Sequence, residues 1–129
     1  MNTSDSKMSA ALRSRIRDLI PTAENQYSCF LDFDAGFTGF EGHFEGNPIV
    51  PGVCLIETAR VIAEEITRKT LRTGKISQAR FRRPILAGER ADVTVKLTEQ
   101  PEDRSWKIQT DFRVGTAVSA QLRMELEAI

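Results

Sequence analysis

Two residues of one segment have the types and the spacing for acid/base chemistry. His43 is the only histidine of the chain, and Glu57 lies fourteen residues further on inside an apolar run. The segment that joins them is rich in glycine and proline, which makes a loop stiff and specifically shaped. An imidazole titrates near neutral pH and serves as a general base when its orientation is fixed. The segment therefore predicts a two-residue acid/base site.

Both residues also have an interpretation without chemistry. His43 could be a packed or surface imidazole, and Glu57 could be a helix-surface carboxylate paired with Arg60 three residues later. Against the second interpretation, Cys54 lies about one turn before Glu57 and Val61 one turn after it, so this stripe of the helix looks apolar. A carboxylate buried on such a stripe is suited to donating a proton at neutral pH. Both interpretations stay open.

Gly52 is the third candidate, because it stands where the helix is expected to start. The backbone N–H groups of a first helical turn have no partner within the helix and lie at the positive end of its dipole. Such a donor can polarise a carbonyl that gains negative charge in a transition state. The alternative is an ordinary glycine at a helix start.

Periodicity predicts the elements that would position these residues. Apolar residues at helical spacing predict a short helix over 8–20, ended by Pro21, and a long helix over 51–71, ended by Thr73-Gly74. Residues 1–7 are expected to be a disordered tail and residues 8–129 a single domain. Alternation with a period of two predicts strands over 27–33, 76–84, 91–98, 106–114 and 118–128. One buried helix that faces an antiparallel sheet of five to six strands is an α+β architecture.

Composition excludes several classes of function. The chain has 18 Lys and Arg against 18 Asp and Glu, which argues against a nucleic-acid binder that neutralises phosphates. No apolar run approaches the roughly 18 to 20 residues of a membrane span, and the N-terminus has no apolar signal core, so we expect a cytoplasmic protein. Cys29 and Cys54 are expected to be small core residues in a reducing compartment. A single histidine with scattered carboxylates predicts no metal site.

Two blocks of the sequence resemble a known family. His43-Phe44-x-Gly-Asn-Pro-Ile-Val-Pro-Gly-Val, followed by Glu57, closely resembles the signature of bacterial (3R)-hydroxyacyl-acyl-carrier-protein dehydratases of the FabZ/FabA type. A second block, from Ala79 to Glu89, resembles the strand "KFRRPVxPGD" of the same family. The resemblance covers roughly residues 25–128. It implies the hot-dog fold, in which a long antiparallel sheet wraps around one central helix.

The resemblance also implies a mechanism and an assembly. His43 would remove the C2 proton of a (3R)-hydroxyacyl thioester, and Glu57 of the partner subunit would protonate or orient the departing 3-hydroxyl. The Gly52 N–H would polarise the thioester carbonyl, while Phe44 and Val53 would line the substrate-binding site. Members are at least dimers, joined edge to edge through their sheets. They need no metal or redox cofactor, because the acyl group arrives on the phosphopantetheine arm of an acyl carrier protein.

Arginines near the second block are candidates for docking that carrier protein, and some positions depart from the family pattern. Arg80, Arg82 and Arg83 could dock an acidic partner or belong to an ordinary solvated strand face. Glu45 stands where the family usually has proline, and Val61 where it often has glutamine. These departures bear on substrate choice more than on reaction type. A hot-dog thioesterase and a non-catalytic acyl-binding subunit remain alternative functions.

Overall fold

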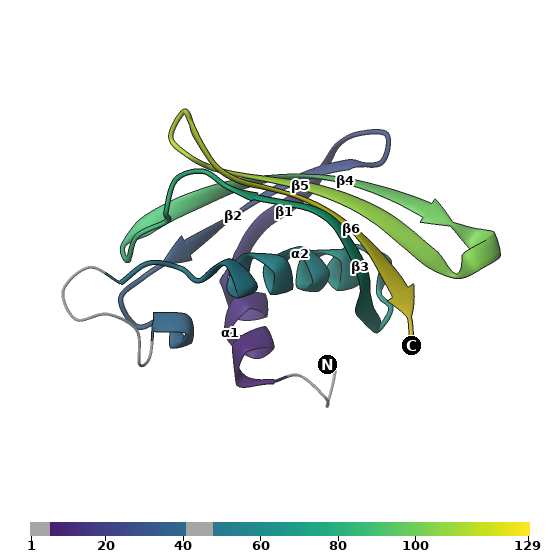
Figure 1. The fold of residues 1–129 in the computed structure, drawn as a ribbon, viewed down its shortest axis with the longest axis horizontal. Coiled ribbons are helices and arrows are strands. Elements are labelled where there is room, and N and C mark those ends of the chain that lie inside the picture. Colours follow the sequence, from purple (N-terminus) through teal and green to yellow (C-terminus); the bar gives the residue numbers. More distant parts are fainter. Residues whose placement is uncertain (1–5, 41–47) are drawn as a thin grey trace.

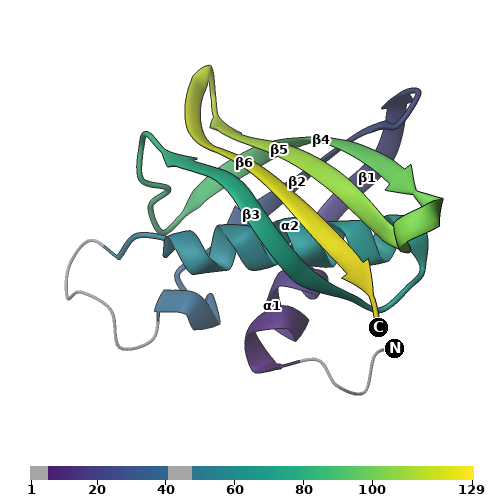
Figure 2. The ribbon, with the colours of Figure 1, turned by 45° about the vertical axis from the view of Figure 1, so that its right-hand side comes forward.

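The computed structural model describes residues 6–40 and 48–129 and shows an antiparallel sheet curved over one helix (Figure 1). Its elements are α1 (Lys7–Arg15), β1 (Ile16–Ala23), β2 (Gln26–Phe33), a 3-10 turn (Thr38–Phe40), α2 (Gly52–Thr67), β3 (Leu71–Phe81), β4 (Glu89–Gln100), a 3-10 turn (Pro101–Asp103), β5 (Ser105–Val114) and β6 (Ala117–Ala128). The six strands have the order β1-β2-β4-β5-β6-β3. Figures 1 and 2 both show α2 against the concave face of the sheet and α1 on the far side of α2. This confirms the α+β prediction of a sheet around a central helix with a short N-terminal helix.

The core lies between α2 and the sheet, and strand alternation builds it. On β4, Ala91, Val93, Val95 and Leu97 are buried while the residues between them are exposed. From α2, Ala59, Ile62 and Ala63 are fully buried. The helix is thus apolar on the sheet side, as its sequence predicted, and the sheet fixes its orientation.

The helix α2 is shorter than predicted. It ends at Thr67, because Arg68 adopts the left-handed conformation (φ 59°) and donates its N–H to the Glu64 carbonyl at 2.8 Å. The expectation that Thr73-Gly74 ends the helix was therefore wrong. Gly74 lies inside β3, which begins at Leu71, five residues before its predicted start.

The N-terminal segment also differs from its prediction. The helix begins at Lys7, capped by the Ser6 hydroxyl, and it ends at Arg15, so only part of the predicted helix over 8–20 forms. Residues 16–23 form β1 instead, with Pro21 inside it. A strand at the edge of a sheet tolerates proline, because the missing N–H is not needed by a second neighbour. Residues 1–5 of the expected tail lie outside the described residues.

The core also holds an aromatic cluster and both cysteines. Phe37 is 1% exposed and packs edge-on against Phe33 and Phe40, with ring centroids 5.1 and 5.4 Å apart. Cys29 and Cys54 are buried and free of disulfides. The described part of the chain has no helix that is both long and apolar enough to cross a membrane. The aromatic cluster anchors the chain just before the segment that carries the candidate site.

Candidate active site

The first two turns of α2 carry the candidate catalytic and substrate-binding residues that the structure describes. Gly52 is the first residue of the helix and Glu57 follows in its second turn. Gly52 is half-buried, and Val53 projects outward with an exposed fraction of 70%. His43 and Phe44, predicted to act as base and to line the substrate, lie outside the described residues, as does Glu45.

The second motif block holds the chain that leads into α2. Val50 donates its N–H to the Ile85 carbonyl at 2.8 Å, and the bridge between Ile49 and Leu86 runs beside this bond. The Glu89 carboxylate in turn accepts from the Leu86 N–H at 2.7 Å and from the Arg83 guanidinium at 3.0 Å. The bonds from Arg83 and Leu86 hold the pKa of Glu89 below its ordinary value. The two blocks that looked separate in sequence therefore form one support for the helix start.

Glu57 does not lie on the purely apolar stripe that the sequence suggested. Its carboxylate accepts a hydrogen bond from the Arg60 guanidinium and another from the Ser9 hydroxyl at 3.2 Å. Its side chain is 28% exposed. The expectation of an apolar surrounding was wrong, because Arg60 at i+3 shares this face of α2 and α1 supplies a buried serine. The pair with Arg60, which the sequence left open, is formed.

Cys54 lies about one turn before Glu57, and its burial shows that this face of α2 is shielded from solvent. Burial, with a contribution from the charge of Glu57, raises the pKa of the Cys54 thiol to about 11. The thiol donates to the Met8 sulfur at 3.6 Å, so α1 covers it as well. The first turn of α1 and the first two turns of α2 therefore make one packed unit around the carboxylate.

The three arginines of the predicted docking surface differ in how they are bound. Arg83 is held by Glu89 and by the Pro84 carbonyl. Arg82 follows β3 and donates to the Gln121 side chain at 3.2 Å. Arg80 lies on β3 and is exposed. The charge of Arg83 is thus largely matched within the chain, whereas Arg80 and Arg82 present cationic groups to solvent.

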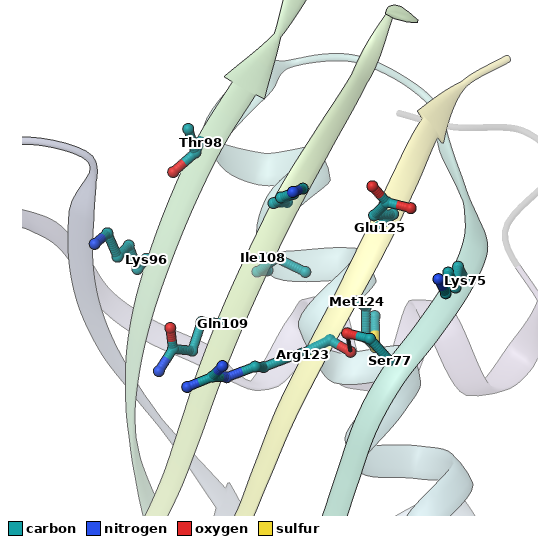
Figure 3. A pocket seen from close by; sticks show the side chains of 10 residues that line it. Lys75, Ser77, Lys96, Thr98, Ile108, Gln109, Arg123, Met124 and Glu125 are labelled. Carbon is teal, nitrogen blue, oxygen red and sulfur yellow. Dashed lines mark hydrogen bonds between the residues drawn. The ribbon is translucent and has the colours of Figure 1, made fainter.

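A hollow on the opposite face of the sheet contains none of the predicted site residues (Figure 3). Side chains of β3, β4, β5 and β6 line it on the face away from α2, among them Lys75, Lys96, Lys107, Arg123 and Glu125. Opposite charges are interleaved there, since Glu125 pairs in register with both Lys75 and Lys107. This arrangement is typical of a solvated strand face, and it lies across the sheet from Glu57.

Sequence reasoning missed one residue of the site and underrated another. Ser9 is 2% exposed and contacts Glu57 across 48 positions of sequence, and no local pattern indicates such a contact. Arg60 could be found from its i+3 spacing, but only as a surface partner. In the structure its side chain is 14% exposed, so the pair lies in a partly closed environment.

The curved sheet around a single helix, with a carboxylate in the second helical turn, defines a hot-dog domain with a candidate acid/base site. The chain belongs to the ApeI-like dehydratase family, whose model, described as ApeI dehydratase, matches residues 20–121. Among curated proteins it is 38% identical over 89 residues to the 3-hydroxyacyl-acyl-carrier-protein dehydratase FabZ of Rhizobium etli, covering 64% of this chain and 57% of that protein. The FabZ of an Anaeromyxobacter species is 34% identical over 92 residues, with 64% and 58% covered. The chain thus spans somewhat more than half the length of these relatives.

Solved structures share the fold at low sequence identity. The dehydratase heterocomplex ApeI:P from Xenorhabdus doucetiae superposes with a TM-score of 0.73 at 17% identity, covering 86% of this chain and 95% of the other. A sigma28-regulated virulence protein from Campylobacter jejuni has a TM-score of 0.66 at 9% identity, with 92% and 95% covered. These similarities establish the hot-dog fold.

Proposed function

We propose that the protein dehydrates (3R)-hydroxyacyl thioesters of an acyl carrier protein to trans-2-enoyl thioesters, in fatty-acid synthesis or a specialised lipid or polyene pathway. The observation that carries the proposal is the place of Glu57, held by Arg60 and Ser9 in the second turn of α2. This is where the dehydratase signature has its helix carboxylate, fourteen residues after the histidine. Membership in the ApeI-like family and 30–38% identity to several FabZ enzymes support the same reaction.

The reaction needs one base and one group at the departing oxygen. His43 takes the C2 proton, and the electron pair of the broken C2–H bond forms the C2–C3 double bond. The C3–O bond breaks, and the oxygen leaves as water with a proton supplied within the site. Glu57 contacts this oxygen and orients or protonates it. Substrate equals product plus water, so the step needs no oxidant or reductant.

Gly52 supports the developing charge on the thioester carbonyl. Removing the C2 proton moves electron density onto the carbonyl oxygen, and a backbone N–H at a helix start is placed to stabilise it. Val53 follows Gly52 and is exposed on the same turn, where it is suited to contact the acyl chain together with Phe44. The acyl group arrives on phosphopantetheine, and Arg80 and Arg82 attract the acidic carrier protein. Carriers of this kind act in the cytoplasm, which we infer to be the location.

The proposal includes a dimer, and the free edge of β3 supports it. β3 stands at one end of the sheet and is 11 residues long, and a long edge strand is a template for pairing with another chain. Its pairing with β6 has irregularities before Gln78 and is regular from Gln78 to Phe81. Apolar side chains gather beside this edge: Ile76 is 44% exposed, Phe81 52% and Val53 70%. A second copy that adds its own β3 would cover them.

Complementation between two inactive variants tests the shared site. We expect His43→Ala and Glu57→Gln each to abolish most turnover. A mixed dimer has one His43→Ala subunit and one Glu57→Gln subunit. If each site is built from both subunits, one site of this dimer carries both substitutions and the other site carries neither. Random exchange of the two variants should therefore restore about a quarter of the wild-type turnover. If each site lay within one subunit, every site would keep one lesion and no activity would return.

A further inference from the structure

We propose that Arg60 is a positioning residue for Glu57. It is the centre of a hydrogen-bonded cluster, called the clamp below, which consists of Arg60, Glu64 and the α1 residue Ser9. This inference rests on the proposed function, since it concerns how the helix carboxylate is held for that reaction. It goes beyond the family signature, because it assigns roles to Arg60 and Ser9, which that signature does not include.

The guanidinium of Arg60 uses its donors on four different groups. Besides Glu57, it donates to the Leu71 carbonyl at 3.0 Å and to the Ser9 hydroxyl at 3.2 Å, and it lies 2.9 Å from the Glu64 carboxylate. A planar guanidinium with several donors in a fixed fork loses its freedom when this many partners are satisfied. Arg60 is therefore held rigidly before any substrate arrives.

Glu64 is the anchor of the clamp. Its side chain is 4% exposed, and its two oxygens accept from Arg13 at 2.7 Å and from the Leu71 N–H at 2.8 Å in addition to Arg60. A buried carboxylate with this set of partners is fixed in place. Because Glu64 fixes Arg60 and Arg60 fixes Glu57, the orientation of Glu57 is set by the helix α2 itself and by the start of β3.

The helix α1 supplies the last contact. Ser9 is buried, accepts from Arg60 and donates to the second oxygen of Glu57 at 3.2 Å. Both carboxylate oxygens of Glu57 are thus bound, one by Arg60 and one by Ser9. A side chain held at both oxygens keeps one orientation, which is what a group that must meet a departing hydroxyl requires.

The test is a double-mutant cycle on turnover with Arg60→Ala, Glu57→Gln and the two combined. If Arg60 acts through Glu57, Arg60→Ala lowers kcat about tenfold to a hundredfold with little change in KM, because a small misplacement of a reacting group is costly. In the Glu57→Gln background the same change should have no further effect on kcat. Arg60→Lys should restore part of the loss.

Arg15→Ala is the matched control, because it removes an α1 arginine that pairs with Asp34 and has no contact with Glu57, Arg60 or Glu64 among those described. We expect it to lower the free energy of unfolding while kcat stays near the wild-type value. Should Arg60→Ala fail to fold, Ser9→Ala removes the other contact to Glu57 and should also lower kcat. The inference is overturned if Arg60→Ala lowers kcat by the same factor in both backgrounds.

Crystal structures separate this inference from the proposed function. In Arg60→Ala the Glu57 side chain should leave its wild-type orientation or become disordered, whatever reaction the protein catalyses. A Glu57 carboxylate that stays in place without Arg60 would refute the clamp even if the wild type is an active dehydratase. A wild type that does not turn over hydroxyacyl thioesters would refute the function, and the orientation of Glu57 in the variant would still decide on the clamp.

Discussion

The ring of Phe81, at the end of β3, lies directly against Gly52, the first residue of α2. A Cβ atom at Gly52 would stand 2.9 Å from the ring Cζ of Phe81 and 3.1 Å from its Cε1. Real Cβ atoms almost never show a contact below 3.0 Å, so any larger residue requires the half-exposed Phe81 ring to move. The helix start that carries the proposed carbonyl donor is therefore fitted against the strand proposed to form the dimer edge.

This contact makes Gly52→Ala a sensitive variant. We expect the Phe81 ring to swing away from the new methyl group and to disturb the β3 edge, and kcat/KM to fall severalfold where this movement shifts the adjoining N–H donor. Steady-state kinetics measures the loss. Combining the change with Phe81→Ala, which makes room for the new methyl group, should recover part of it; a kcat/KM that stays equally low in the double variant would show that the loss does not come from this contact.

The buried carboxylate of Glu64 is expected to dominate the stability of the helix packing. Glu64→Ala removes the partner of Arg13, Arg60 and the Leu71 N–H, and uncompensated buried charges cost about 3 kcal/mol of the free energy of unfolding. Urea denaturation measures it. Glu65→Ala is the control, because Glu65 is 36% exposed and its pair with Arg13 should contribute less than about 1 kcal/mol. Equal losses in the two variants would contradict the assigned role.

The two free edges of the sheet offer a matched test of the dimer. Ile76 on β3 is 44% exposed and Ile20 on β1 is 53% exposed. If copies join through β3, Ile76→Glu should shift the protein toward monomers in analytical ultracentrifugation, whereas Ile20→Glu should leave the assembly unchanged. The opposite pattern would place the interface at β1.

The two cysteines give the protein a defined response to alkaline pH. Burial raises the pKa of Cys29 to about 12 and that of Cys54 to about 11, against an ordinary value of 9.0. The thiols of the unfolded chain lose their protons at a lower pH than the buried thiols of the folded chain. Their burial therefore contributes its full amount to the free energy of unfolding below about pH 9, and this contribution is lost as the pH rises toward the raised pKa values. Unfolding by urea across this range should show the decline, and Cys29→Ala should flatten it. Rapid alkylation of the native protein at about pH 8 would contradict the raised pKa values.

Substrates on two different carriers distinguish an effect on docking of the acyl carrier protein from an effect on the chemical step. Arg80→Glu combined with Arg82→Glu should lower kcat/KM about tenfold for a substrate on acyl carrier protein, since steering by opposite charge is lost. The same variant should act normally on a pantetheine thioester, which has no acidic protein attached. Equal effects on both substrates would show that these arginines do not dock the carrier.

Local periodicity predicted most of the strands, because each alternates between buried and exposed residues along its own length. β2, β5 and β6 lie close to their expected positions, and the turn between β5 and β6 places Gly115 at a positive φ of 60°. The segment over 16–23 was missed, since its apolar residues also fit a helix and Pro21 looked like a helix end. Only the free outer side of β1 makes that proline acceptable.

The site was predictable in part. The sequence indicated Gly52 at the helix start and Glu57 inside the helix, and both are found there. It could not indicate the surroundings of Glu57, because Ser9 comes from a distant helix and Glu64, a charged residue one turn beyond Arg60, has the pattern of a solvent-facing position. Packing of α1 on α2 turns those residues inward, where Arg60 and Glu64 are both well buried. Tertiary contacts of this kind leave no local signal.

The central claim is tested most directly by identifying the product that the wild type forms from a (3R)-3-hydroxyacyl thioester of acyl carrier protein. Mass spectrometry of the carrier, with assay of free thiol, distinguishes the outcomes. The account predicts loss of one water with the thioester intact, giving the trans-2-enoyl carrier, and loss of this product in Glu57→Gln. Release of free carrier thiol without an enoyl product would indicate a thioesterase, and an unchanged carrier would indicate a binding subunit; either result contradicts the account.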